Sequence, residues 1–194
     1  MTEIAKRKAT YADLEAVHPH LVAEIIYGSL VTHPRPTPRH AAAHHSLGSE
    51  LGGPFQNGRG GPGGWIFLTE PELHFGEDIV VPDLAGWKRE RLSPFPETAY
   101  IETPPDWLCE ILSESTERFD RREKREIYAR VGVKHLWLLD PRKKNLECYA
   151  LVAGKWLLGR IYLNNEIVSA PPFEVASFAI NKLWPFDDVK KISE

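Results

Sequence analysis

The chain has 194 residues, of which 42% are hydrophobic and 26% are charged, and its formal net charge is −3 at pH 7. A chain of this length buries a sizeable core as one domain, expected to span residues 1–194, without the help of crosslinks. The composition excludes a globally basic nucleic-acid-binding protein, so that any DNA-binding surface is expected to be a local patch.

The two cysteines, Cys109 and Cys148, stand in separate apolar segments and form no C-x-x-C pair. This spacing excludes a disulfide framework and a thiolate zinc site, and it predicts two buried core residues. The N-terminal segment lacks the apolar stretch of a secretion signal, and no later segment approaches the roughly 20 apolar residues of a membrane span. We therefore expect a protein of the reducing cytoplasm.

The N-terminal part predicts a short helix followed by a β-hairpin. Thr10 and Asp13 have the spacing of a helix N-cap and its acidic partner. Residues 21–31 read LVAEIIYGSLV, two apolar runs around Tyr27-Gly28, where glycine supplies the positive φ of a tight turn. Glu24 is the charged residue that interrupts the first run.

A proline-rich segment, a helix and a loop come next. Three prolines exclude regular structure over residues 32–39, and residues 40–51, with three consecutive alanines, favour a helix. Residues 56–64 read QNGRGGPGG and predict a mobile loop, because the segment lacks the Gly-Lys-Ser/Thr ending that a phosphate-binding P-loop requires.

The middle of the chain predicts three strands, two of which carry a conspicuous acid. The apolar segments 65–75 and 79–87 are separated by turn-forming residues, and Asp83 falls within the second of them. The apolar run 107–112 follows two prolines and has the pattern of a buried strand. Glu110 is the exception in that run.

The C-terminal half predicts a charged helix and further strands. Residues 117–130 favour a helix that lies mostly at the surface, and residues 134–140 and 146–158 favour a strand and a hairpin. The apolar residues between 171 and 184 predict a segment that packs back on the domain or on a second subunit. The order of elements predicts an α/β or α+β fold with helices against a mixed sheet.

Asp83 and Glu110 are the first candidates for chemistry. An ionised carboxylate in an apolar strand costs free energy unless it is paired, protonated or bound to a cation. Carboxylates on adjacent strands can place their oxygens around one Mg²⁺ ion, which prefers such ligands. Taken singly, each acid is equally well explained by an arginine partner or a turn cap, and only the pair favours a metal site.

Lys124 is the third candidate, because its predicted helix directly follows the Glu110 strand. Asp120, Lys124 and Tyr128 share one face of that helix at steps of four residues, so that the lysine can reach the acidic pair. The alternative is an exposed ion pair between Asp120 and Lys124, worth only a few tenths of a kcal/mol.

Over about residues 11–156 the chain resembles the Uma-type family of "putative restriction endonucleases", a branch of the PD-(D/E)XK nuclease superfamily. The motifs that carry this resemblance are the Glu24 hairpin, the proline-rich segment with His40, Val81-Pro82-Asp83, the run from Pro104 to Ser113, the set Asp120, Lys124 and Tyr128, Gly132-Val133, and the run from Trp137 to Pro141.

The resemblance implies a restriction-endonuclease-like sheet core flanked by helices, with an N-terminal helix and hairpin. It also implies a Mg²⁺ or Mn²⁺ site and a set of assisting residues. The implied roles are Asp83, Glu110 and Ile111 as metal ligands, Glu24 as a supplementary ligand or water-orienting acid, and His40, Asp120 and Tyr128 as substrate-binding or supporting residues. The superfamily places a lysine two residues after the second acid, where this chain has Leu112. The resemblance therefore assigns the lysine function to Lys124.

The expected function is a metal-dependent endonuclease that hydrolyses DNA phosphodiester bonds. A homodimer is expected as well, because two active sites cut two strands. The alternative is a catalytically silent protein that keeps the fold as a nucleic-acid-binding or assembly module. Basic runs at 88–91, 118–125 and 142–144 are candidate phosphate contacts, although the acids among them favour a solvated surface.

The histidines support a third interpretation, a histidine-based metalloenzyme that acts on small molecules. His40 and His44 stand at i and i+4 on the predicted helix, with His33 and His45 nearby, which is a spacing compatible with a transition-metal site. This interpretation predicts that metal binds at His40 and His44 instead of at Asp83.

Overall fold

A computed structural model of the protein describes residues 7–187. The predicted domain 1–194 begins and ends outside the described residues. The first residues of the N-terminal segment, which was expected to lack a secretion signal, also lie outside them. Within residues 7–187, every helix is too short or too polar to cross a membrane.

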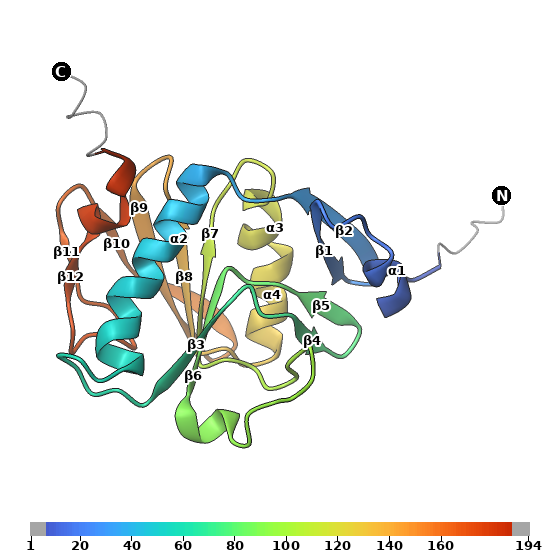
Figure 1. The fold of residues 1–194 in the computed structure, drawn as a ribbon, viewed down its shortest axis with the longest axis horizontal. Coiled ribbons are helices and arrows are strands. Elements are labelled where there is room, and N and C mark those ends of the chain that lie inside the picture. Colours follow the sequence, from blue (N-terminus) through green and yellow to red (C-terminus); the bar gives the residue numbers. More distant parts are fainter. Residues whose placement is uncertain (1–6, 188–194) are drawn as a thin grey trace.

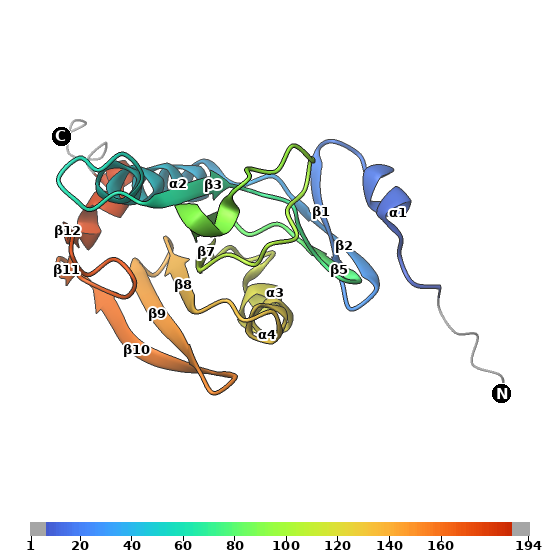
Figure 2. The same ribbon diagram turned by 90° about the horizontal axis from the view of Figure 1, so that it is seen from below.

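A six-stranded mixed sheet forms the centre of the fold (Figure 1). Its strands are β3 (Trp65–Thr69), β6 (Leu84–Lys88), β7 (Trp107–Ile111), β8 (His135–Asp140), β9 (Asn145–Val152) and β10 (Lys155–Leu163). They lie in the order β10-β9-β8-β7-β6-β3, with β7 and β8 parallel and the other neighbours antiparallel. Helix α2 (Pro38–Leu51) covers one face, and α3 (Glu117–Arg121) and α4 (Glu123–Arg130) cover the other (Figure 2).

Strand β7 separates two apolar cores because its side chains alternate between the faces of the sheet. Trp107, Cys109 and Ile111 join the cluster that contains Leu47 of α2. Leu108 and Leu112 join the cluster that contains Ile127 of α4. Glu110 lies two residues from both Leu108 and Leu112 and therefore on the same face of the sheet, so that its carboxylate is directed toward α4.

A second sheet of four strands, in the order β2-β1-β5-β4, lies beside the helices α3 and α4 (Figure 1). Its strands are β1 (Leu21–Ile26), β2 (Ser29–Pro34), β4 (Leu73–Phe75) and β5 (Asp78–Val80). The predicted hairpin is confirmed, with Tyr27 and Gly28 in the turn at φ values of 50° and 73°. The N-terminal helix α1 (Tyr11–Glu15) begins with the predicted capping box between Thr10 and Asp13. The expected mixed sheet flanked by helices is therefore confirmed.

The prediction of two long strands over 65–75 and 79–87 is wrong, because each segment divides between the two sheets. The chain leaves the large sheet after Thr69, forms the β4–β5 hairpin of the small sheet, and returns at Leu84. Pro82 has no N–H group to donate to a ladder, which favours a break at this point. Asp83 consequently lies in the link between β5 and β6, at the junction of the sheets, and not within a strand.

The segment 32–39 also contains more regular structure than expected. Strand β2 continues to Pro34, which stands at the end of an edge strand where a missing N–H is tolerated. Helix α2 begins at Pro38 and is capped by Thr37. Proline is tolerated there because the backbone N–H groups of the first helical turn have no partner within the helix.

The predicted helix 117–130 is divided at Arg122, whose φ of −120° and ψ of −88° lie outside the helical range. Arg121, before the break, pairs with Glu147 at 2.7 Å, whereas Lys124, after it, lies 3.0 Å from the buried Glu24. The expectation of a mostly exposed helix is therefore wrong at its inner face, where Asp120 and Lys124 are 2% and 3% exposed.

The apolar C-terminal residues pack on their own chain. They lie in and around short elements, which are β11 (Ile167–Val168), β12 (Phe178–Ala179) and the helical turns η3 (Ile180–Leu183) and η4 (Pro185–Asp187). Phe173, Ile180 and Leu183 are buried in the cluster that also holds Leu47 of α2. Because these side chains are buried within their own chain, they do not form a contact surface for a second subunit. Two further turns, η1 (Gly52–Gln56) and η2 (Arg89–Leu92), follow α2 and β6.

The tight approach of β3, β6 and β7 generates a prediction at Gly86. A Cβ atom at this position would lie 2.8 Å from Cε1 of Phe67 and 3.3 Å from Cε3 of Trp107. Because Trp107 is buried in the core and Phe67 packs against it, we expect Gly86→Ala to lower the free energy of unfolding by about 1–3 kcal/mol in a urea titration.

Gly48→Ala is the matched control. Its Cβ would meet Cδ2 of Leu84 at an ordinary distance of 3.8 Å, and alanine raises helix propensity by up to about 1 kcal/mol. We expect this variant to be at least as stable as the wild type. Equal destabilisation by both substitutions would contradict the steric explanation.

Candidate functional site

The predicted site residues converge where the two sheets meet the α3–α4 pair. Glu24 comes from β1, Asp83 from the link before β6, Glu110 from β7, and Lys124 from α4. One pocket is lined by Asp83, Glu110, Lys124, His40 and Asp120. Glu24 and Tyr128 are fully buried and contact residues of that lining.

The ammonium group of Lys124 is the centre of the cluster. Its Nζ atom lies 2.9 Å from Oε1 of Glu110, 3.0 Å from Oε1 of Glu24 and 3.5 Å from Oδ1 of Asp120. It also donates a hydrogen bond of 3.4 Å to the carbonyl oxygen of Val81. Burial lowers the pKa of Lys124, but the surrounding carboxylates outweigh burial and hold it well above its usual range. The lysine is therefore a fixed cation, and the alternative of an exposed Asp120–Lys124 pair is wrong.

Glu110 is the most constrained of the acids. Its Oε1 accepts a short hydrogen bond from the hydroxyl of Tyr128. Its Oε2 accepts one of 3.4 Å from the backbone N–H of Asp83. Burial raises the pKa of Glu110 to about 7; Lys124 opposes this rise and the charge of Asp83 adds to it. Burial likewise raises the pKa of Asp120 well above its usual range in spite of Lys124. Negative charge in the cluster is thus incompletely compensated.

Glu24 is held in its ionised form. Oε1 accepts a hydrogen bond of 2.7 Å from the N–H of Val81, and Oε2 lies 3.0 Å from Nε2 of His33. Burial acts to raise the pKa of Glu24, but Lys124 and His33 lower it to about 2. The hairpin therefore brings a permanent negative charge to Lys124 from the small sheet.

Asp83 lies at the mouth of the cluster, with 16% of its side chain exposed. Its Oδ2 accepts a hydrogen bond of 2.7 Å from the N–H of Ile111, and its Oδ1 lies 3.1 Å from Nε2 of His40. Burial lowers the pKa of His40, and the contact with Asp83 outweighs this effect and raises it. Ile111 is buried and has an apolar side chain, so that it can offer a metal only its main-chain carbonyl.

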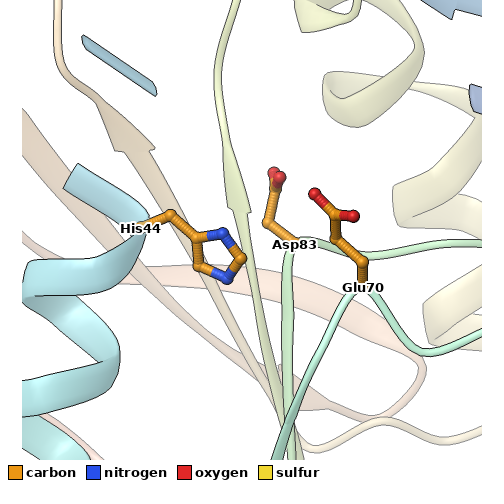
Figure 3. Close-up of side chains that lie close together, drawn as sticks. All are labelled: His44, Glu70 and Asp83. Atoms are coloured by element: carbon orange, nitrogen blue, oxygen red, sulfur yellow. The ribbon is translucent and has the colours of Figure 1, made fainter. Parts of the chain in front are cut away.

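Glu70 was missed by the sequence analysis, and it lies beside Asp83. Its N–H donates a hydrogen bond of 2.9 Å to the carbonyl oxygen of Asp83, where β3 ends and β6 begins. A ring nitrogen of His44 and carboxylate oxygens of Glu70 and Asp83 all lie within 4.8 Å of one another (Figure 3). Burial lowers the pKa of His44. Glu70 follows an apolar run and precedes Pro71, which is the ordinary context of an acid at a strand end, so that only its pairing next to Asp83 identifies it.

The histidines and Asp83 belong to the same region of the molecule. His40 contacts Asp83 directly, and His44 lies one turn farther along α2. The two histidines therefore lie beside Asp83 and not apart from it, and a metal site at His40 and His44 in place of Asp83 stays a prediction. The imidazole of His33 is paired with the carboxylate of Glu24, and His45 is exposed.

The basic runs are mostly engaged in ion pairs. Their contacts include Arg91 with Asp106, Arg121 with Glu147, and Arg142 with Asp140 and Glu117. Within these runs, Lys124 is the basic residue that lines the acidic pocket. Arg35, which was not singled out from the sequence, adds a second positive charge to the lining.

The burial of Lys124 among acids generates a stability prediction. Removing one partner of a buried charge cluster leaves the others uncompensated and costs about 3–5 kcal/mol. We expect Lys124→Met to lower the free energy of unfolding by this amount in urea at pH 8. Adding Glu24→Gln should recover part of the loss, because it removes one of the uncompensated charges. Equal stability of Lys124→Met and the wild type would contradict this account.

Comparisons with known proteins give the family and the fold. The family model Uma2, "Putative restriction endonuclease", matches residues 9–181. The crystal structure of a protein from Anabaena variabilis, described as "a putative nuclease belonging to DUF820", has a TM-score of 0.72 and 20% sequence identity, and the match covers 88% of this chain and 94% of that chain. No curated protein matches the chain. The likeness of structure supports the fold alone, whereas the family match spans most of the sequence. The chain therefore belongs to the Uma2 family, as its motifs predicted.

Proposed function

We propose that the protein is a metal-dependent endonuclease that hydrolyses phosphodiester bonds in DNA. The observation that carries the proposal is the buried ammonium group of Lys124, which is paired with the Glu110 carboxylate in a pocket that Asp83 also lines. A catalytic cation beside a metal-binding acid pair is suited to stabilising the charge that develops on a phosphate in the transition state.

The donor set fits a hard divalent cation. Carboxylates outnumber cations in the pocket, and burial together with like charges raises the pKa of Glu110. A cation that binds Asp83 and Glu110 relieves this excess of negative charge. Asp83, Glu110 and the carbonyl of Ile111 would hold Mg²⁺ or Mn²⁺. The bound ion supplies Lewis-acid catalysis and lowers the pKa of water in its coordination shell.

The surrounding residues keep the reactive groups in place. Glu24 and Asp120 hold the ammonium group of Lys124, which is thus preorganised to face a phosphate at the pocket mouth. Tyr128 fixes the Glu110 carboxylate, and His40 orients Asp83. Arg35 in the pocket lining is suited to a neighbouring phosphate of the backbone.

A homodimer is part of the proposal on the argument that two active sites cut two strands. The apolar C-terminal segment no longer supports it, since that segment is buried in its own chain. A strictly monomeric species in a sedimentation run of the active protein would remove the dimer from the proposal.

The test is cleavage of supercoiled plasmid and of single-stranded DNA in Mg²⁺ or Mn²⁺. We expect cleavage to stop on chelation of the metal. Asp83→Asn, Glu110→Gln and Lys124→Met should each lower the rate by on the order of 100-fold or more, because each removes a charge that acts on the transition state. Asp83→Asn changes a residue at the pocket mouth, and it tests the proposal if Lys124→Met does not fold.

Glu77→Gln and Lys155→Met are the matched controls, since both residues are exposed and lie outside the pocket. They should cut at the rate of the wild type. DNA binding without cleavage in either metal would contradict the endonuclease and support the silent binding module of the same fold.

A further inference from the structure

His44, Glu70 and Asp83 form a group whose side chains could hold a metal ion, and the proposed nuclease centre does not use them as a set (Figure 3). They come from α2, from the residue that follows β3, and from the link before β6. The backbone hydrogen bond from Glu70 to Asp83 ties two of these positions together. The group is therefore built on three adjoining segments of the fold.

The third member, His44, offers an unsatisfied donor or acceptor. Its Nε2 atom is buried and has no hydrogen-bond partner among the described residues, although buried polar atoms in proteins are normally paired. The neighbouring His40 shares this feature, since its Nδ1 atom is also buried without a hydrogen-bond partner among the described residues, while its Nε2 atom lies 3.1 Å from Asp83. A ring nitrogen of His44 lies within 4.8 Å of carboxylate oxygens of Glu70 and Asp83, and an imidazole beside two carboxylates is suited to bind a cation.

We propose that His44, Glu70 and Asp83 bind a second divalent cation, next to the first and sharing Asp83 with it. One imidazole and two carboxylates favour a first-row transition ion such as Mn²⁺ or Zn²⁺, whereas the all-oxygen set of the first site favours Mg²⁺ or Mn²⁺. This inference rests on the proposed function only in so far as it assumes the first cation site, with which it shares Asp83.

The geometry needs only a small contraction. Ligand atoms around such an ion at about 2.1 Å lie at most about 4.2 Å apart, and the three groups here lie within 4.8 Å. Glu70 is exposed, so that its carboxylate can move inward without disturbing the core. A broad pocket lined by His44 and Glu70 opens this side of the group to solvent, and gives a hydrated ion a way in.

The test counts bound Mn²⁺ from the loss of the sharp electron paramagnetic resonance spectrum of free Mn²⁺. We expect two ions per chain in the wild type and one in the double variant His44→Ala/Glu70→Gln, which removes two of the three ligands. Glu110→Gln should lose the other ion and retain the one at His44. The affinity at each lost site should fall by more than about 100-fold, since loss of a supporting residue alone costs about 10–100-fold.

The matched control is His45→Ala/Glu77→Gln, which removes one exposed histidine and one exposed glutamate outside the group. It should bind two ions. One ion in the wild type, or two in His44→Ala/Glu70→Gln, would overturn the second site. Two bound ions without DNA cleavage would support the second site and contradict the endonuclease. DNA cleavage with a single bound ion would support the endonuclease and contradict the second site.

Discussion

The ammonium group of Lys124 and the carboxylates around it are the interaction on which the arrangement of this protein depends. Burying an ion costs several kcal/mol unless its partners are in place. Here the partners come from distant segments, with Glu24 on β1, Glu110 on β7 and Asp120 on α3. The small sheet, the large sheet and the helix pair must therefore all be docked before the lysine is satisfied.

The alternation of β7 explains why this cluster lies on one face of the large sheet. Trp107, Cys109 and Ile111 pack toward α2, which leaves Glu110 on the opposite face with α4. Asp83 precedes β6 and has access to both sides of the sheet, because its carboxylate contacts His40 of α2 and its backbone N–H donates to Glu110 on the opposite face. This residue is the common point of the two proposed cation sites.

The same features make the pocket costly to fold and useful for binding. The raised pKa of Glu110 has burial as its largest cause, and the nearby carboxylates add to it. A group of acids that is incompletely neutralised in the folded chain favours an added cation. The short hydrogen bond from Tyr128 and the contacts of Lys124 restrict rearrangement of the side chains. The pocket is in this sense preorganised, since little ordering remains to be done when a ligand binds.

Local features of the chain were readable from the sequence because they depend on neighbouring residues. The turn at Tyr27-Gly28, the capping box at Thr10 and the apolar run around Glu110 follow from φ preferences, side-chain capping and period-two burial. The family motifs likewise selected Lys124 for a role beside the acids, and the structure brings it to Glu110.

Other features were decided only by the tertiary structure. The division of segments 65–75 and 79–87 between two sheets is set by which strands they meet, and a pattern of apolar residues is the same in either sheet. Glu70 joins Asp83 because β3 pairs with β6. Sequence by itself determined the hairpin turn, the capping box, the buried strand of Glu110 and the acid and lysine candidates, since these follow from short-range preferences and motifs. Burial and pairing across distant segments determined which charges are fixed, exposed or shared, because desolvation and Coulomb interactions depend on distances that only the folded chain defines.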